Sequence, residues 1–148
     1  MNWQTYIKSF QSYLKIERGL SKNTIDNYSF DLFRLTQFLD ENAILKNPIT
    51  IGEEEIQQFI YFVSKEVNPR SQARIISGLK SFFNYLIFED YRTNNPMELI
   101  ETPRLGRKLP DTLSLQDIDR LIAAIDLSKE EGERNKAMLE TLYGCGLR

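Results

Sequence analysis

One group of cationic and hydroxyl side chains could bind an anionic ligand. Arg70, Ser71, Arg74 and Lys80 fall in a stretch whose only counter-charge is Glu66. Arg70 and Arg74 are four residues apart, so a helix places them on one face. Guanidinium groups, hydroxyls and the free N–H groups of a first helical turn all bind phosphate oxygens and base edges. The group therefore indicates a candidate surface for nucleic acid.

Small residues accompany these cations on the same expected helix. Ser71, Arg74, Gly78 and Ser81 share a face opposite the apolar residues, by their spacing. A face of small side chains allows close approach of another molecule. We therefore expect this face to be free for a ligand.

A second polar group opens another expected helix. It consists of Ser21, Lys22, Asn23 and Thr24. The argument from a cationic first turn applies here as well. Polar first-turn residues more often only cap and solubilise a helix, so a purely structural role for Ser21 stays open.

Three further cations stand in a stretch without periodicity, between residues 102 and 110. Arg104, Arg107 and Lys108 are flanked there by Pro103 and Pro110. Prolines stiffen a linker, and stiffened cations suit a strap across a phosphate backbone. A solvated interdomain tether explains the same residues equally well.

The composition excludes several classes of function. Nineteen Lys and Arg against 21 Asp and Glu give a net charge of −2, so any anion binding must be local. With no histidine and a single cysteine, the chain cannot form an internal disulfide, a Cys/His zinc site or a Ser-His or Cys-His nucleophile. We expect no metal and no cofactor. No apolar stretch approaches membrane length, which favours a cytoplasmic protein without membrane contact.

Four amphipathic helices must position the polar groups. Apolar residues at three- and four-residue spacing predict a helix from residue 3 to about 18, stopped by Gly19, and a second to about residue 40, capped by Ser21. Thr50 and Glu53 have capping-box spacing before a short third helix. Asn68 followed by Pro69 predicts the start of a long fourth helix.

Two more helices are predicted beyond residue 110. Ser114 and Asp117 cap the first, which carries Leu121 and Ile122, and the second carries Met138 and Leu142 before Gly144. About forty residues rarely close an independent core, so we expect these apolar side chains to be exposed. The sequence thus predicts an all-α chain with a domain at residues 1–101, a linker at 102–110, and the first part of a larger domain at 111–148.

Several segments, taken in their order and spacing, carry a family resemblance. The chain resembles the N-terminal part of a tyrosine recombinase of the phage integrase family, bacterial Xer type. The matching segments are Glu17–Thr24, Tyr28 with Asp31-Leu32, Ala73-Arg74, Gly78–Leu86, Asn95-Pro96, Pro103-Arg104, Leu109-Pro110, Leu113-Ser114, Lys136–Glu140, Leu142-Tyr143 and Gly146–Arg148.

The resemblance implies a SAM-like, four-helix core-binding domain that grips one side of a duplex recombination half-site, with its second and fourth helices facing the major groove. Residues 111–148 match the start of the catalytic domain. Gly146-Leu147-Arg148 matches the motif with the first catalytic arginine, so Arg148 would hold the scissile phosphate in the parent protein. The parent would cut DNA with a tyrosine nucleophile, inside a tetramer of recombinase protomers and without a cofactor.

The rest of the family's catalytic set has no counterpart in this sequence, so we expect this chain alone to bind DNA without cutting it. Chromosome-dimer resolution, which serves chromosome partition, and mobile-element integration both fit the resemblance. The negative net charge and the unpartnered apolar residues also allow a different class, a helical protein-interaction module that does not bind DNA.

Overall fold

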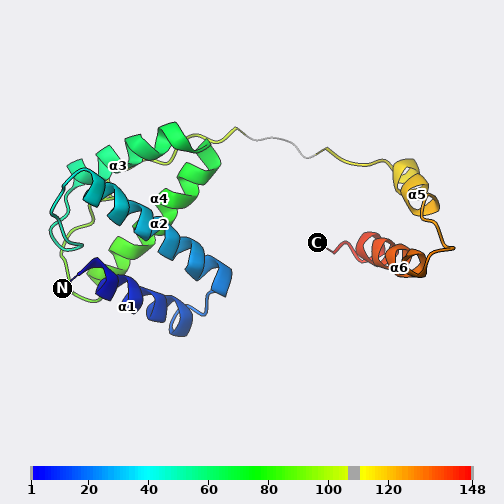
Figure 1. Cartoon of the computed structure of the whole chain (residues 1–148), viewed down its shortest axis with the longest axis horizontal. Helices are drawn as coiled ribbons and strands as arrows, with labels where there is room; N and C mark the ends of the chain where they lie inside the picture. The colour runs from blue at the N-terminus through cyan, green and yellow to red at the C-terminus, as the bar shows by residue number, and fades with distance from the viewer. Residues whose placement is uncertain (1, 107–110, 148) are drawn as a thin grey trace. The chain divides into compact units, whose positions relative to one another are not determined.

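The computed structural model describes residues 2–106 and 111–147, and its regular elements are all α-helices (Figure 1). No strand occurs among these residues, so the all-α prediction is confirmed. The helices are α1 (Trp3–Ile16), α2 (Lys22–Glu41), α3 (Glu53–Glu66), α4 (Pro69–Phe88), α5 (Leu115–Ala123) and α6 (Glu130–Gly144). The chain divides into two compact units with the boundary after Gly106. This boundary falls inside the predicted linker, whose last four residues are outside the described ranges.

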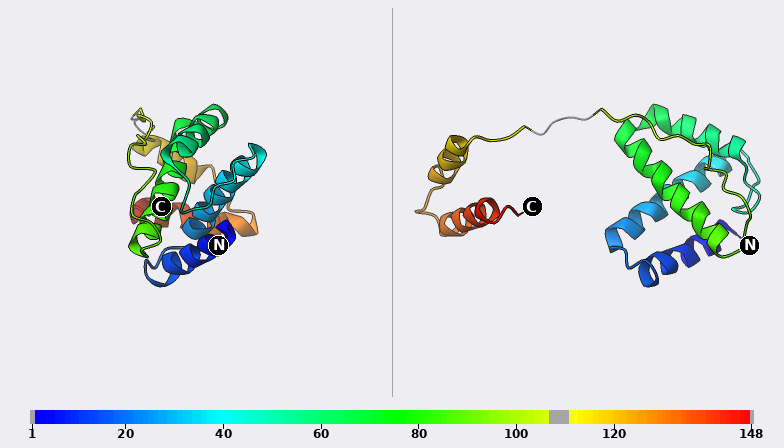
Figure 2. Two further views of the ribbon diagram at one scale, coloured as in Figure 1. Left: turned by 90° about the vertical axis from the view of Figure 1, so that its left-hand side faces the viewer. Right: turned by 180° about the vertical axis from the view of Figure 1, so that it is seen from behind.

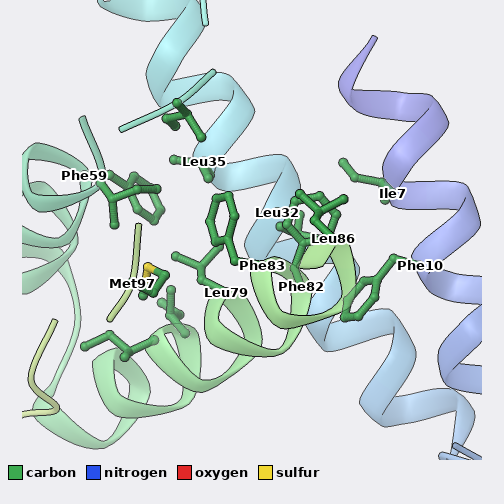
Figure 3. Close-up of a cluster of buried hydrophobic side chains, with 14 of the residues drawn as sticks. Ile7, Phe10, Leu32, Leu35, Phe59, Leu79, Phe82, Phe83, Leu86 and Met97 are labelled. Atoms are coloured by element: carbon green, nitrogen blue, oxygen red, sulfur yellow. The ribbon is translucent and has the colours of Figure 1, made fainter. Parts of the chain in front are cut away.

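Helix α4 is the centre of the first unit. It packs against both α2 and α3, while α1 packs against α2, and the view from behind shows α4 crossing α2 (Figure 2). The core consists of the apolar stripes of these helices, and Phe82 and Phe83 of α4 are fully buried in it (Figure 3). Burying one such side chain stabilises the fold by about 1.5–3 kcal/mol. The packing fixes where the polar ends of α2 and α4 lie.

Three predicted helix ends are confirmed. Gly19 has φ +58°, and this left-handed residue ends α1 while the Leu20 N–H donates to the Leu14 carbonyl at 3.0 Å. The Oγ of Ser21 accepts the Thr24 N–H at 3.3 Å, at the start of α2. The Oδ1 of Asn68 accepts the Ser71 N–H at 2.9 Å, at the start of α4.

The predicted capping box at the start of α3 is wrong. Gly52 is the N-cap, and its N–H donates to Oε2 of Glu55 at 2.8 Å. The hydroxyl of Thr50 instead accepts the Asn47 N–H at 3.1 Å, inside the preceding turn. Ile51 lies between the two positions and is buried in the core, so the chain stays non-helical through it and the helix starts later than the local pattern suggests.

The second unit contains α5 and α6, which pack against each other. The predicted cap of α5 is confirmed, because the Asp117 N–H donates to Ser114 Oγ at 3.2 Å and the Ser114 N–H donates to Asp117 Oδ2 at 3.1 Å. No residue of α5 is buried. Leu121, Met138 and Leu142 are exposed, as expected, and Ile122 is half-buried. The apolar stripes of this unit therefore remain largely in contact with water.

Candidate nucleic-acid interface

The start of α2 presents a polar first turn. Ser21, Lys22 and Asn23 are exposed, whereas Thr24 is half-buried. The hydroxyls of Ser21 and Thr24 lie 2.9 Å apart and bond to each other, so part of their hydrogen-bonding capacity is used within the turn. Lys22 and Asn23 are the residues of this group most available to a ligand.

The start of α4 combines an available cation with a capping contact. Arg70 is exposed one residue after Pro69. Ser71 is half-buried, and its N–H is the group that Asn68 caps. Arg70 is therefore placed as predicted, on the exposed first turn of α4, while Ser71 contributes to the end of the helix.

Arg74 forms a bidentate ion pair with Asp31 of α2. Its Nη1 donates to Oδ2 at 2.6 Å and its Nη2 donates to Oδ1 at 2.7 Å. The Asp31 side chain is completely buried, while that of Arg74 is 42% exposed. Burial raises the pKa of the Asp31 carboxyl, and the Arg74 guanidinium opposes this rise. The pair locks α4 to α2, a role that sequence reasoning missed.

A local signal of this pair was present in the sequence. Asp31 lies among the apolar positions of α2, between Tyr28 and Leu35, where a carboxylate needs a partner. The spacing within α2 does not identify that partner, because Arg74 lies 43 residues away. Arg74 keeps an exposed edge, so its predicted contact with DNA stays a prediction beside its structural role.

The expectation that the small-residue face of α4 is free for a ligand is wrong at Gly78. A Cβ at this position would lie 3.0 Å from Oδ2 of Asp31 and 3.2 Å from Cδ1 of Tyr28. Gly78 is buried. Helix α2 of the same chain, and not a ligand, contacts α4 at Gly78, because the two helices cross at this point.

A groove of about 650 Å³ lies between the end of α1, the turn after it, α2 and the middle of α4. Its polar lining comes from Arg18, Tyr28, Ser77, Lys80, Ser81 and Asn84. None of the described residues that line it is acidic, so the charged side chains of its lining are the two cations Arg18 and Lys80. The predicted residue Lys80 lies in this groove, together with Arg18 and Asn84, which the sequence prediction did not include.

A second groove, of about 570 Å³, lies between α1 and α2. Lys8, Lys15 and Lys22 line it, with Asp26 as its one acidic lining residue among those described. Lys8 and Lys15 are seven residues apart, a spacing that puts them on one face of a helix and could have identified them from the sequence. Leu20 lines both grooves, so the turn after α1 separates them.

The remaining predicted residues lie after α4. Arg104 is exposed on the non-helical segment that follows the first unit's core. Arg107, Lys108 and Arg148 lie outside the described residues. Within residues 2–106 and 111–147, no three acidic or cysteine side chains gather as metal ligands would. No helix in these ranges is long and apolar enough to cross a bilayer.

Comparison with known proteins gives relatives over most of the chain. The family model "Phage integrase, N-terminal SAM-like domain" matches residues 7–90. The tyrosine recombinase XerD of Listeria innocua is 41% identical over 143 residues, which cover 96% of this chain and 48% of the relative. XerD of Pseudomonas putida is 37% identical over 142 residues, 96% of this chain and 47% of the relative. The chain spans about half the length of the curated relatives that it matches.

Proposed function

The chain belongs to the phage integrase family of tyrosine recombinases and contains the N-terminal SAM-like domain of that family; on this premise we propose that residues 1–101 bind duplex DNA at a recombination half-site. The observation that carries the proposal is the groove beside α4, which is lined by Arg18 and Lys80 and by no described acidic residue. In a chain of net charge −2, such a local concentration of positive charge suits a polyanion.

The crossing of α2 and α4 supports this function mechanically. A helix fits the major groove of B-DNA, where exposed polar side chains reach base edges and cations reach phosphates. Lys22 and Arg70 on the two first turns and Lys80 in the groove would contact phosphates, while Asn23 and Asn84 would reach the bases. The Asp31–Arg74 pair would hold the two helices at a constant angle, since it joins them through two short hydrogen bonds.

For the whole protein, of the relatives' length, we propose site-specific recombination. The linker cations Arg104, Arg107 and Lys108 would strap the duplex, residues 111–148 would begin the catalytic domain, and Arg148 would hold the scissile phosphate. Other recombinase protomers would be its partners in a tetramer on DNA. Such a protein would work in the cytoplasm on nucleoid DNA, in chromosome-dimer resolution or in mobile-element integration.

The test is a fluorescence-anisotropy titration of the full chain with labelled duplexes, including one inverted-repeat recombination site, at several salt concentrations. We expect binding whose affinity falls as salt rises. The variant Arg70→Gln or Lys80→Gln should reduce the steepness of log K against log salt by about 0.9 for each phosphate that the protein no longer neutralises.

Lys65 provides the matched control. It lies over the ring of Tyr61 on α3, and it lines neither groove. The variant Lys65→Gln removes the same charge and should leave the salt dependence unchanged. Absence of binding to every duplex at low salt would contradict the proposal.

A protein-interaction module is the second candidate, and the exposed Leu121, Met138 and Leu142 favour it. If the chain binds no duplex, sedimentation equilibrium should then show association that Met138→Lys abolishes. If the chain is a monomer in sedimentation equilibrium and binds DNA, the protein-interaction module is excluded and DNA binding remains.

A further inference from the structure

The hydrogen bonds after α4 determine how the side-chain amide of Asn84 is turned. The backbone N–H of Met97 donates to Oδ1 of Asn95 at 2.8 Å. A backbone N–H can only donate, so the oxygen of the Asn95 amide must face Met97. The Nδ2 of Asn95 then donates to Oδ1 of Asn84 at 2.7 Å. The NH₂ group of Asn84 is consequently left free for another acceptor.

Asn84 lies in the cation-lined groove. It is exposed, and it is seven residues after Ser77 on the same face of α4. Its neighbours in the lining include Arg18 and Lys80, which only donate hydrogen bonds. Serine and tyrosine hydroxyls complete the polar lining, and the Ser77 hydroxyl already donates to the Ala73 carbonyl at 2.9 Å. The two cations and the NH₂ group of Asn84 can only donate, so a ligand that bonds to these three groups must supply acceptors.

From this arrangement we propose that Asn84 is a specificity-determining residue that reads guanine, with its orientation set by Asn95; the inference rests on the proposed DNA-binding function. In the major groove guanine presents two acceptors, N7 and O6. An asparagine that reads adenine needs both its amide N and its amide O, whereas the bond from Asn95 takes one of the two acceptor positions of the Asn84 oxygen and keeps that oxygen turned toward Asn95. Cytosine presents a donor, which the Asn84 NH₂ group repels.

The environment of Asn95 makes this orientation a property of the free protein. Asn95 is half-buried and is followed by Pro96 and Met97, which are both buried. Its amide is anchored to the backbone before any DNA arrives. A side chain already held in its binding orientation loses less conformational freedom on binding, so Asn84 discriminates more sharply than a freely rotating amide.

The experiment selects bound sequences from a randomised duplex pool with the full chain and sequences them. The unaltered protein should enrich a motif with guanine at one or more positions. In Asn84→Ala the donor is removed without a change of charge, and the preference for guanine over adenine at one such position should fall by about five- to a hundred-fold. In Asn84→Asp the preferred base at that position should change from guanine to cytosine, because a carboxylate accepts a hydrogen bond from the cytosine N4 amino group.

Asn95→Asp is the sharper variant, because it leaves residue 84 unchanged. The new carboxylate accepts the Met97 N–H and can only accept from Asn84 as well, so the Asn84 amide must turn its oxygen toward the groove. The base preference should then change at the same position as in the Asn84 variants. Gln58→Glu, an equal change of charge at an exposed position of α3, is the control and should leave the motif unaltered. Circular dichroism checks that each variant is folded.

The outcomes separate the two proposals. If the unaltered chain enriches a motif and all the Asn84 and Asn95 variants enrich that same motif, the reading by Asn84 is wrong while the DNA-binding function stands. If the unaltered chain binds no duplex and enriches nothing, the proposed function fails and the inference fails with it. A change at one position in the Asn84 variants but none in a folded Asn95→Asp leaves Asn84 as a reader and overturns its orientation by Asn95.

Discussion

Helices α4 and α5 begin alike and end in different environments. Each is amphipathic, and each starts at a side-chain cap, Asn68 for α4 and Ser114 for α5. Helix α4 buries eight of its residues against α1, α2 and α3, whereas α5 buries none. A periodic apolar stripe with a cap thus specifies a helix, but the burial of that stripe depends on what other elements the chain supplies.

Ion pairs show the same contrast. In the first unit Arg74 pairs with the completely buried Asp31 at 2.6 Å. In the second unit the Arg120–Asp117 pair is 4.0 Å long, and its arginine side chain is 80% exposed. Exposed pairs contribute little to stability, typically about 0–1 kcal/mol, whereas a buried charge that loses its partner is costly. A buried ion pair therefore helps to hold helices together in the first unit, whereas the ion pair of the second unit lies at the surface in contact with water.

Amide hydrogen exchange should show the largest difference between the two units. Residues 70–88 open only with the whole first unit, while residues 115–144 lie in helices that bury almost nothing. For a unit stable by about 5 kcal/mol, protection of α4 should exceed that of α5 and α6 by at least about a thousand-fold. The measurement is exchange followed by mass spectrometry or NMR. Uniform protection would show that the second unit has a core of its own.

Truncation of one apolar side chain in each unit should sharpen the comparison. Phe82→Ala removes a fully buried ring and should lower the free energy of unfolding by about 3–5 kcal/mol. Leu121→Ala removes an exposed side chain and should change it by less than about 0.5 kcal/mol. Urea unfolding followed by circular dichroism measures both. An equal loss of stability in the two variants would mean that Leu121 has apolar partners.

Removing the partner of the buried carboxylate comes next in size. Arg74→Met should destabilise the first unit by about 2–3 kcal/mol, since Asp31 is left buried and unpaired, while water still reaches the half-exposed Arg74 position. Adding Asp31→Asn should recover part of this stability, and Arg120→Met should have little effect. Thermal and urea unfolding give the coupling energy. If the changes in the free energy of unfolding caused by the Arg74 and Asp31 variants are strictly additive, the two side chains do not stabilise each other and the ion pair is contradicted.

The two left-handed glycines give the smallest contrast. Gly19 has φ +58° at the end of α1, and Gly146 has φ +60° after α6. Gly19→Ala should cost about 1 kcal/mol, because a side chain disfavours this conformation at the turn that leads into α2. Gly146→Ala should not move the melting transition of the first unit. Equal shifts in that transition would show that the two ends are coupled.

Much of the local structure was predictable. The predicted helix ends occur at the predicted residues, which are Gly19, Ser21, Asn68 and the Ser114–Asp117 pair. Each helix end depends on residues within a few positions of one another, so the sequence carries the whole signal. The family resemblance also came from short segments in order, and the family match over residues 7–90 confirms it.

The candidate site was predictable only in part. Lys80 lies in the groove beside α4, and Asn84 shares its helix face at a spacing of four residues, but no short-range pattern connects Arg18 to this groove. Gly78, predicted to face a ligand, contacts α2 instead. The shift of the α3 cap from Thr50 to Gly52 follows from the burial of Ile51, which is itself a tertiary event.

The sequence alone therefore determined the helices, their ends, the uneven distribution of charge and the family. Only the tertiary structure decided that Arg74 serves Asp31, that α2 occupies the small-residue face of α4, and that Asn95 turns Asn84. The physical reason is range. Capping and periodicity act between residues one to four apart, whereas these contacts join residues at least 11 apart, whose meeting depends on how the helices pack.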